Sequence, residues 1–134
     1  MATDTAGNVG QEYPQNVVHY LAKRISYADG ATNVYTLGTL PPGATVINAG
    51  VVVTTAFNAG SGNVLDIGTS SDDDGFATDL ALGTVGNIVW DEFATSNDLY
   101  STSAVTVTAT LALTGTAATT GAGTVYVTYV IPGR

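Results

Sequence analysis

Residues 103–113 decide the fold of this chain and read Ser-Ala-Val-Thr-Val-Thr-Ala-Thr-Leu-Ala-Leu. From Val105 onward, Val, Ala and Leu at odd-numbered positions alternate with Thr and Ala at even-numbered positions. A β-strand places successive side chains on opposite faces, whereas a helix would scatter this pattern around its circumference. Residues 124–131 repeat the alternation, and the Thr-, Gly- and Ala-rich residues 114–123 have the composition of a hairpin loop. The pattern therefore predicts two long strands joined as a hairpin.

The rest of the chain carries the same kind of signal in shorter pieces. Pro, Gly, Asn and Asp separate extended segments, which we place at about 17–27, 33–37, 44–57, 64–67, 77–82 and 86–93. In 44–57 we expect the odd-numbered residues, Ile47 among them, on one face, and Gly50 predicts a bulge or a close backbone approach. These segments predict an all-β fold, an antiparallel β-sandwich of seven to eight strands with little or no helix. A jelly-roll-like topology is preferred to an immunoglobulin-like one, and the strand order stays open.

Length and composition limit the domain organisation. The chain has 134 residues, which suits one domain. Residues 1–15 are small and polar and are expected to form an N-terminal arm, with the β-sandwich domain over 16–134. There is no Cys, which excludes disulfides and thiolate metal ligands. Nothing near the N-terminus has the basic and apolar regions of a secretory signal, and no apolar run approaches the ~20 residues of a membrane span.

Charge is scarce and unevenly distributed. Only 10% of residues are charged, with 11 Asp and Glu against 3 Lys and Arg, so the net charge is -8. Nucleic-acid binding needs clustered cations, so neither a nucleic acid nor a membrane is expected as a partner. Residues 101–131 contain no charged residue and no His.

A charge-free sheet surface is either an inert Thr-rich exterior or a contact with another subunit, because the cores of protein interfaces are depleted in charge. We favour the contact. The candidate interface residues are those expected to point outward from the last two strands, together with one residue of the arm: Thr106, Thr108, Thr110, Tyr126, Val130 and Tyr13.

Few residues suggest chemistry. His19 is the only histidine, and it is interpreted as structural or interfacial because no nucleophile motif accompanies it. Residues 72–75, Asp-Asp-Asp-Gly, lack the alternate acidic spacing of a calcium loop. A solvated acidic loop is the default interpretation, and a nonspecific cation site formed by Asp72, Asp74 and Asp79 stays open.

Catalysis is not predicted. Asp91 and Glu92 are adjacent on an expected strand and point to opposite faces, so they do not form a carboxylate pair by themselves. The aromatic residues Trp90, Phe93, Tyr100 and Phe76 could form a sugar platform but more often form a core or an interface. We therefore expect no enzyme, no catalytic residue, no cofactor and no metal site.

One central region resembles a known class of proteins. Residues 35–47 read Tyr-Thr-Leu-Gly-Thr-Leu-Pro-Pro-Gly-Ala-Thr-Val-Ile, and residues 51–58, 64–69 and 74–77 continue the likeness. Over roughly residues 33–80 the chain resembles head decoration or cement proteins of tailed bacteriophages, which are small jelly-roll-like virion proteins. The resemblance gives a structural role and no individual binding residue.

The resemblance implies a place and partners. Such proteins are made in the host cytoplasm and then sit on the outer surface of the capsid. There they bind the major capsid protein and their own copies, with a homotrimer favoured and a dimer next. A net charge of -8 suits a position outside the packaged DNA. Two other classes remain open. One is a carbohydrate- or receptor-binding module of a tail fibre or cell-surface protein, stacking sugars on Trp90 and Tyr100, and the other is a small sandwich hydrolase.

Overall fold

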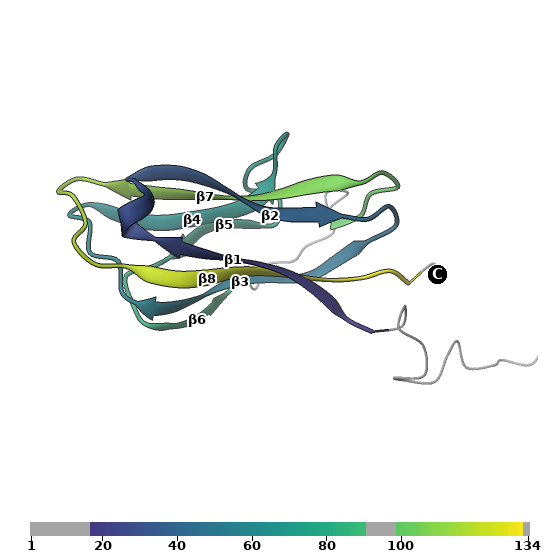
Figure 1. Cartoon of the computed structure of the whole chain (residues 1–134), viewed down its shortest axis with the longest axis horizontal. Coiled ribbons are helices and arrows are strands. Elements are labelled where there is room, and N and C mark those ends of the chain that lie inside the picture. Colours follow the sequence, from purple (N-terminus) through teal and green to yellow (C-terminus); the bar gives the residue numbers. More distant parts are fainter. Residues whose placement is uncertain (1–16, 91–98, 133–134) are drawn as a thin grey trace, which may run out of the picture.

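A computed structural model describes residues 17–90 and 99–132 of the chain, and in this part it consists of strands and one short 3-10 turn (Figure 1). The turn is Tyr27–Asp29, and Ser26 caps its start by accepting a hydrogen bond from the Ala28 amide at 3.2 Å. Eight strands are formed: β1 (His19–Ser26), β2 (Thr32–Leu40), β3 (Thr45–Thr55), β4 (Gly62–Thr69), β5 (Ala77–Ala81), β6 (Gly86–Val89), β7 (Val105–Thr114) and β8 (Ala122–Val130).

The strands form two four-stranded antiparallel sheets packed face to face (Figure 1). The first sheet has the order β1-β8-β3-β6 and the second the order β2-β7-β4-β5. β1 pairs with β8, β2 with β7, β3 with β6 and β4 with β5, as in one long hairpin folded upon itself. This is the pairing of a jelly roll, so the predicted all-β sandwich and its preferred topology are confirmed.

The core lies between the sheets and follows the alternation seen in the sequence. Val107, Ala109 and Leu111 of β7 are fully buried, and Val125 and Val127 of β8 face them from the other sheet. Burying a side chain of the size of Val or Leu contributes roughly 1.5–3 kcal/mol. The largest other fully buried side chains come from β3, β4 and the loops beside β5: Val51, Val53, Leu65, Ile67, Phe76 and Leu82.

The expected hairpin between the last two strands is wrong. β7 lies between β2 and β4 in the second sheet, and β8 lies between β1 and β3 in the first. Both hydrogen-bonding edges of each strand are therefore occupied, and β7 and β8 cannot pair with each other. The connection crosses from one sheet to the other, and its end is fixed by a hydrogen bond of 3.1 Å from the Tyr27 amide to the Gly121 carbonyl.

The expected face of β3 also needs correction at two places, and at the second of them Thr55 is exposed beyond a register shift between Val53 and Thr55. The pairing of β3 with β8 shifts between Val46 and Asn48, which is the signature of a bulge. Because of this bulge, the Val46 side chain points into the core and is 3% exposed, whereas the Ile47 side chain points outward and is 47% exposed. At Gly50 the alternative of a close backbone approach is confirmed, since an added Cβ would lie 2.7 Å from the Ile88 carbonyl oxygen.

The predicted arm at 1–15 and the end of the predicted strand at 86–93 lie outside the described residues. Within the described part of the chain, no helix is long and apolar enough to cross a membrane.

Candidate interaction surfaces

The outer face of the first sheet is built from cross-strand rows of residues. The strand register aligns Ala22 of β1, Tyr126 of β8, Gly50 of β3 and Val89 of β6 across all four strands. Residues paired directly across neighbouring strands share a face of the sheet. Two further rows lie beside this one, and they are Tyr20-Thr128-Asn48 and Arg24-Thr124-Val52-Asn87.

Tyr126 lies across the centre of this face. Its hydroxyl and ring carbon Cζ lie 2.9 and 3.1 Å from the place that a Cβ on Gly50 would take, so the missing side chain makes room for the ring. The hydroxyl donates a hydrogen bond of 2.8 Å to Oδ1 of Asn87 on the edge strand. Gly50 and Asn87 therefore hold the Tyr126 ring against the sheet, so the ring does not protrude from the middle of the face.

The outer face of the first sheet exposes apolar side chains among neutral polar ones and is almost uncharged. Tyr20 is 71% exposed, Val52 39% and Val89 38%, and Ile47 adds its side chain at the bulge. Arg24 is the one charged residue in the three rows. Contiguous exposed apolar surface on a monomer marks an interaction site more often than not. We call this surface the neutral face, and define it by Tyr20, Val52, Val89, Tyr126, Val130 and Ile47.

The outer face of the second sheet has a different chemistry. Thr36, Thr108 and Gly68 form one row, and Val34, Thr110 and Asp66 form the next. Thr108 is only 8% exposed within the chain itself, because the loop after β4 folds back over Gly68 beside it. Thr106 is exposed and Thr110 is half-buried.

The predicted interface residues therefore do not form one surface. Thr106, Thr108 and Thr110 point outward from the second sheet, while Tyr126 and Val130 belong to the first. Tyr13 lies outside the described residues. The sequence showed that both last strands lack charge, but it did not show that they belong to different sheets.

Sequence reasoning missed Tyr20, Val52 and Val89 of the neutral face. A signal was present in the run Val51-Val52-Val53, which places apolar side chains on both faces of one strand. Combining that signal with Tyr126 needed the knowledge that β3 and β8 are neighbours, which comes only from the strand order.

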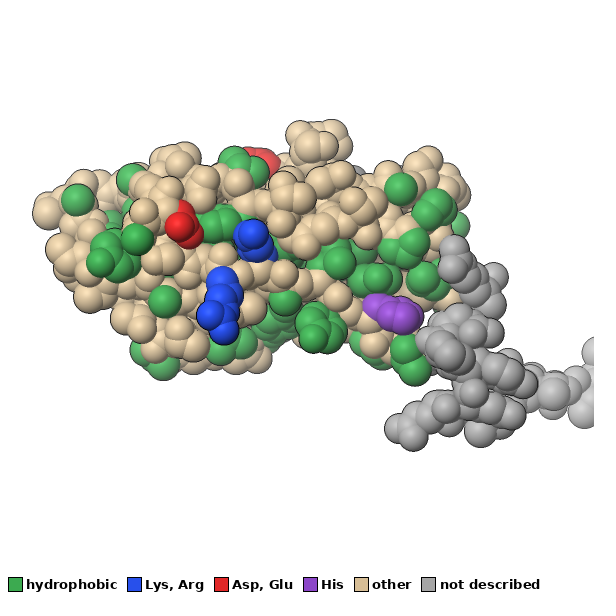
Figure 2. Space-filling view, in the orientation of Figure 1, with side chains coloured by type: hydrophobic (Ala, Val, Ile, Leu, Met, Phe, Trp, Pro, Cys, Tyr) green, Lys and Arg blue, Asp and Glu red, His purple; other side chains and the backbone are tan. Residues whose placement is uncertain are grey.

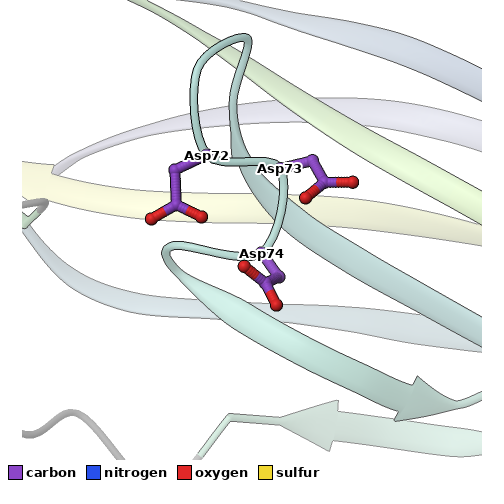
Figure 3. A group of neighbouring side chains, drawn as sticks. All are labelled: Asp72, Asp73 and Asp74. Carbon is purple, nitrogen blue, oxygen red and sulfur yellow. The ribbon is translucent and has the colours of Figure 1, made fainter.

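Of the six acidic residues in the described part of the chain, all but Asp29 lie in or beside the loop that joins β4 and β5. Asp72, Asp73 and Asp74 each place a carboxylate oxygen within 4.8 Å of the others (Figure 3). The Thr69 amide donates to the Asp72 carbonyl at 2.8 Å, and the Phe76 amide donates to the Ile67 carbonyl at 2.8 Å, so both ends of the loop are tied to β4. The three carboxylates form the group, and Asp79, which the sequence grouped with Asp72 and Asp74, is not a member of it.

Asp66 and Asp79 lie on the strands beside this loop. Oδ1 of Asp66 accepts a hydrogen bond of 2.7 Å from the Asp79 amide. Burial raises the pKa of the Asp66 carboxyl above its ordinary value, and the negative charges of Asp79, Asp73 and Asp74 raise that pKa further. The second sheet therefore carries a strongly negative area at its β4-β5 side.

The opposite side of the sandwich carries Lys23 and Arg24. Both residues are exposed on β1, which is an edge strand of the first sheet and lies next to β2, an edge strand of the second. A hollow between these strands is lined by Lys23, Arg24, Asp29, Asn33 and Thr36 among others. Figure 2 shows the basic side chains in blue on this side, with few other charges around them.

Tyr35 closes the inner side of the same hollow. The Tyr35 hydroxyl donates a hydrogen bond of 2.7 Å to Oδ2 of Asp29 and lies 3.3 Å from the Ser26 amide nitrogen and carbonyl oxygen. Burial raises the pKa of the Tyr35 phenol, and the hydrogen bond to Asp29 raises it further. The network fixes the turn between β1 and β2 and so fixes the hollow.

The remaining sequence candidates have structural positions. The His19 ring stacks on the Tyr129 ring with centroids 5.4 Å apart. Phe76 is buried at 2% exposed and Trp90 packs against the core, while Tyr100 is 52% exposed. Phe93, Asp91 and Glu92 lie outside the described residues. The sugar platform thus loses Phe76 to the core, and Trp90 offers only part of its ring.

The fold of this chain, but not its sequence, is similar to that of a known protein. No family model matches the chain, and no curated protein sequence is similar to it. The fold defines it as a jelly-roll β-sandwich. This fold is similar to a chain of the solved structure titled "Cyanophage Pam1 capsid asymmetric unit", with a TM-score of 0.67 and 18% sequence identity. The match covers 98% of this chain and 94% of that chain.

Proposed function

We propose that this protein is a structural component of a tailed-bacteriophage virion, which decorates and cements the outer surface of the capsid. In this role it binds the major capsid protein and its own copies. The observation that carries the proposal is the neutral face, where Tyr20, Val52 and Val89 are exposed and Arg24 is the one charge in the rows. The likeness of the fold to a chain of a cyanophage capsid structure supports the same role.

The separation of charge between the two sheets supports an orientation on the capsid. The neutral face suits contact with the shell because interface cores are depleted in charge. Asp66, Asp79 and the Asp72–Asp74 group belong to the second sheet, so they would face away from the shell. Four strands spaced about 4.8 Å apart and about eight residues long give roughly 500 Å² of flat area. That is more than half of the ~800 Å² per partner in a stable interface.

Neither the site nor the proposed role calls for catalysis, a cofactor or a metal. The hollows that the described residues form around Arg24, around Tyr27 and around Lys23 contain at most one carboxylate each, that of Asp29. A hydrolase that uses two carboxylates needs a pair across a cleft.

Co-sedimentation with shells tests the proposal. Purified protein is mixed with shells of its own phage that lack it, and the bound fraction is measured after centrifugation. We expect saturable binding of the wild type. The double variant V52E/V89E should bind at least tenfold more weakly, since two charges would be buried without partners. The matched control T39E/T114E adds the same charge at exposed positions of the second sheet and should bind like the wild type.

Absence of binding by the wild type contradicts the proposed function. Equal binding by V52E/V89E and the wild type contradicts the assignment of the neutral face.

A further inference from the structure

Among the described residues, the basic pair lies on one side of the sandwich together with Asp29, and the other five acidic residues lie toward the opposite side. Lys23 and Arg24 are the two basic residues of the described chain, and both lie on β1. β1 and β2 form the pair of sheet edges on one side, and β6 and β5 form the pair on the other. The acidic loop joins β4 to β5 and so belongs to the second side.

The basic side of the sandwich contains an open hollow that an acidic group of another molecule could enter. The hollow between β1 and β2 is mostly polar in its lining, with Asn33 and Thr36 offering hydrogen bonds beside Lys23 and Arg24. Asp29 in the same hollow accepts the hydrogen bond from Tyr35, so that carboxylate is already partly satisfied. An incoming carboxylate would therefore meet two cations, neutral polar groups and one carboxylate that already accepts a hydrogen bond.

The acidic side presents the complementary group. Asp73 and Asp74 are exposed, and Asp72 beside them is half-buried. Three carboxylates within 4.8 Å of one another repel each other, and a nearby cation relieves that repulsion. In a chain with a net charge of -8, contact between these acids and the basic residues of a second copy lowers the repulsion between the two copies.

We propose that copies of this protein associate head to tail, with the acidic loop of one copy seated at the basic hollow of the next. This inference rests on the proposed function, because it concerns how copies contact one another around a symmetry axis of the shell. The two surfaces differ, so the contact is heterologous, unlike that of a twofold dimer, and it can repeat from one copy to the next. With the neutral face on the shell, both sides of the sandwich point toward neighbouring copies.

Charge reversal tests the contact. K23E/R24E and D73K/D74K are prepared as separate variants, and all four substitutions are then combined in one chain. Size-exclusion chromatography with light scattering measures the mass at low salt. We expect at least twice the 13.5 kDa subunit mass for the wild type and one subunit for each double variant. The combined variant restores both opposite signs and should recover the oligomer.

Two double variants with the same net charge test whether the position of the charge change matters. K23S/R24S and T39E/T114E each lower the net charge by two, but only the first pair lies at the hollow. We expect K23S/R24S to dissociate the oligomer and T39E/T114E to leave it intact. Salt should dissociate the wild type as the Debye length falls from about 30 Å at 0.01 M to about 3 Å at 1 M. Circular dichroism of each variant verifies that the sandwich is folded.

A monomeric wild type at low salt overturns the proposal. So does a wild-type oligomer that survives in both double-reversal variants, or a combined variant that stays monomeric. None of these results affects co-sedimentation of the wild type with shells, so failure of the contact and failure of the proposed function are distinguishable.

Discussion

At the scale of single residues, Gly50 shows how the neutral face depends on a missing side chain. Replacing Gly50 with Ala would place a Cβ 2.7 Å from the Ile88 carbonyl oxygen and 2.9 Å from the Tyr126 hydroxyl. The backbone atom cannot move without shifting β6, so we expect G50A to lower the free energy of unfolding by about 1–3 kcal/mol. Urea denaturation measures this.

The control for this substitution is Gly83→Ala. Nothing lies within 4 Å of a Cβ added at Gly83. We expect G83A to change the free energy of unfolding by less than about 0.5 kcal/mol. If G50A and G83A change the free energy of unfolding equally, then the close contacts of an added Cβ at Gly50 do not destabilise the folded chain.

Asp66 makes stability depend on pH in a predictable direction. Burial raises the pKa of the Asp66 carboxyl in the folded chain above its ordinary value, so the folded state favours the protonated carboxyl. The stabilisation is complete below the ordinary pKa and is lost as pH rises through the raised folded pKa. Asp66→Asn keeps an oxygen that can accept the Asp79 amide hydrogen and removes the charge.

We therefore expect D66N to melt at a higher temperature than the wild type at pH 7, by a few degrees. The difference should shrink as pH falls through the raised folded pKa, because the wild-type carboxyl then becomes protonated too. Calorimetry from pH 3 to 7 measures both melting temperatures. A difference that grows on acidification would contradict the raised pKa.

At the scale of strands, β7 carries the alternation that identified the fold. Leu111 is fully buried at the middle of the core, and Thr106 on the same strand is exposed. We expect Leu111→Ala to cost about 2–5 kcal/mol because it leaves a cavity between the sheets. Thr106→Ala should change the free energy of unfolding by less than about 0.5 kcal/mol. A small loss in L111A, measured by urea denaturation, would indicate a core that collapses around the cavity.

Strand positions followed from the sequence because each strand alternates and each turn has Gly, Pro, Asn or Asp. The partners of the strands did not follow from it. Residues 114–123 have a hairpin's composition, yet they cross between sheets because β7 and β8 are both central strands. The bulge at Ile47 was missed for a related reason, since a register shift depends on the paired strand β8. Alternation is local, whereas pairing is set by contacts distant in sequence.

At the scale of the whole molecule, the scarcity of charge becomes a division between surfaces. The first sheet presents a face with one charge in its rows, the second sheet carries the acidic group, and the basic pair lies on the β1 edge. The composition shows that the chain has few charged residues, and the strand order shows which sheet surfaces lack them. The candidate site was predicted in part, because Tyr126 and Val130 belong to the neutral face and Thr106, Thr108 and Thr110 do not.

Cysteine labelling of shell-bound protein tests whether the neutral face contacts the capsid shell. The chain contains no Cys, so V52C and T39C each introduce one thiol, on the first and the second sheet respectively. Maleimide labelling rates are compared for each variant free in solution and bound to shells. We expect shell binding to slow the labelling of V52C at least tenfold and to leave the labelling of T39C unchanged. Protection of T39C with free labelling of V52C would contradict this expectation.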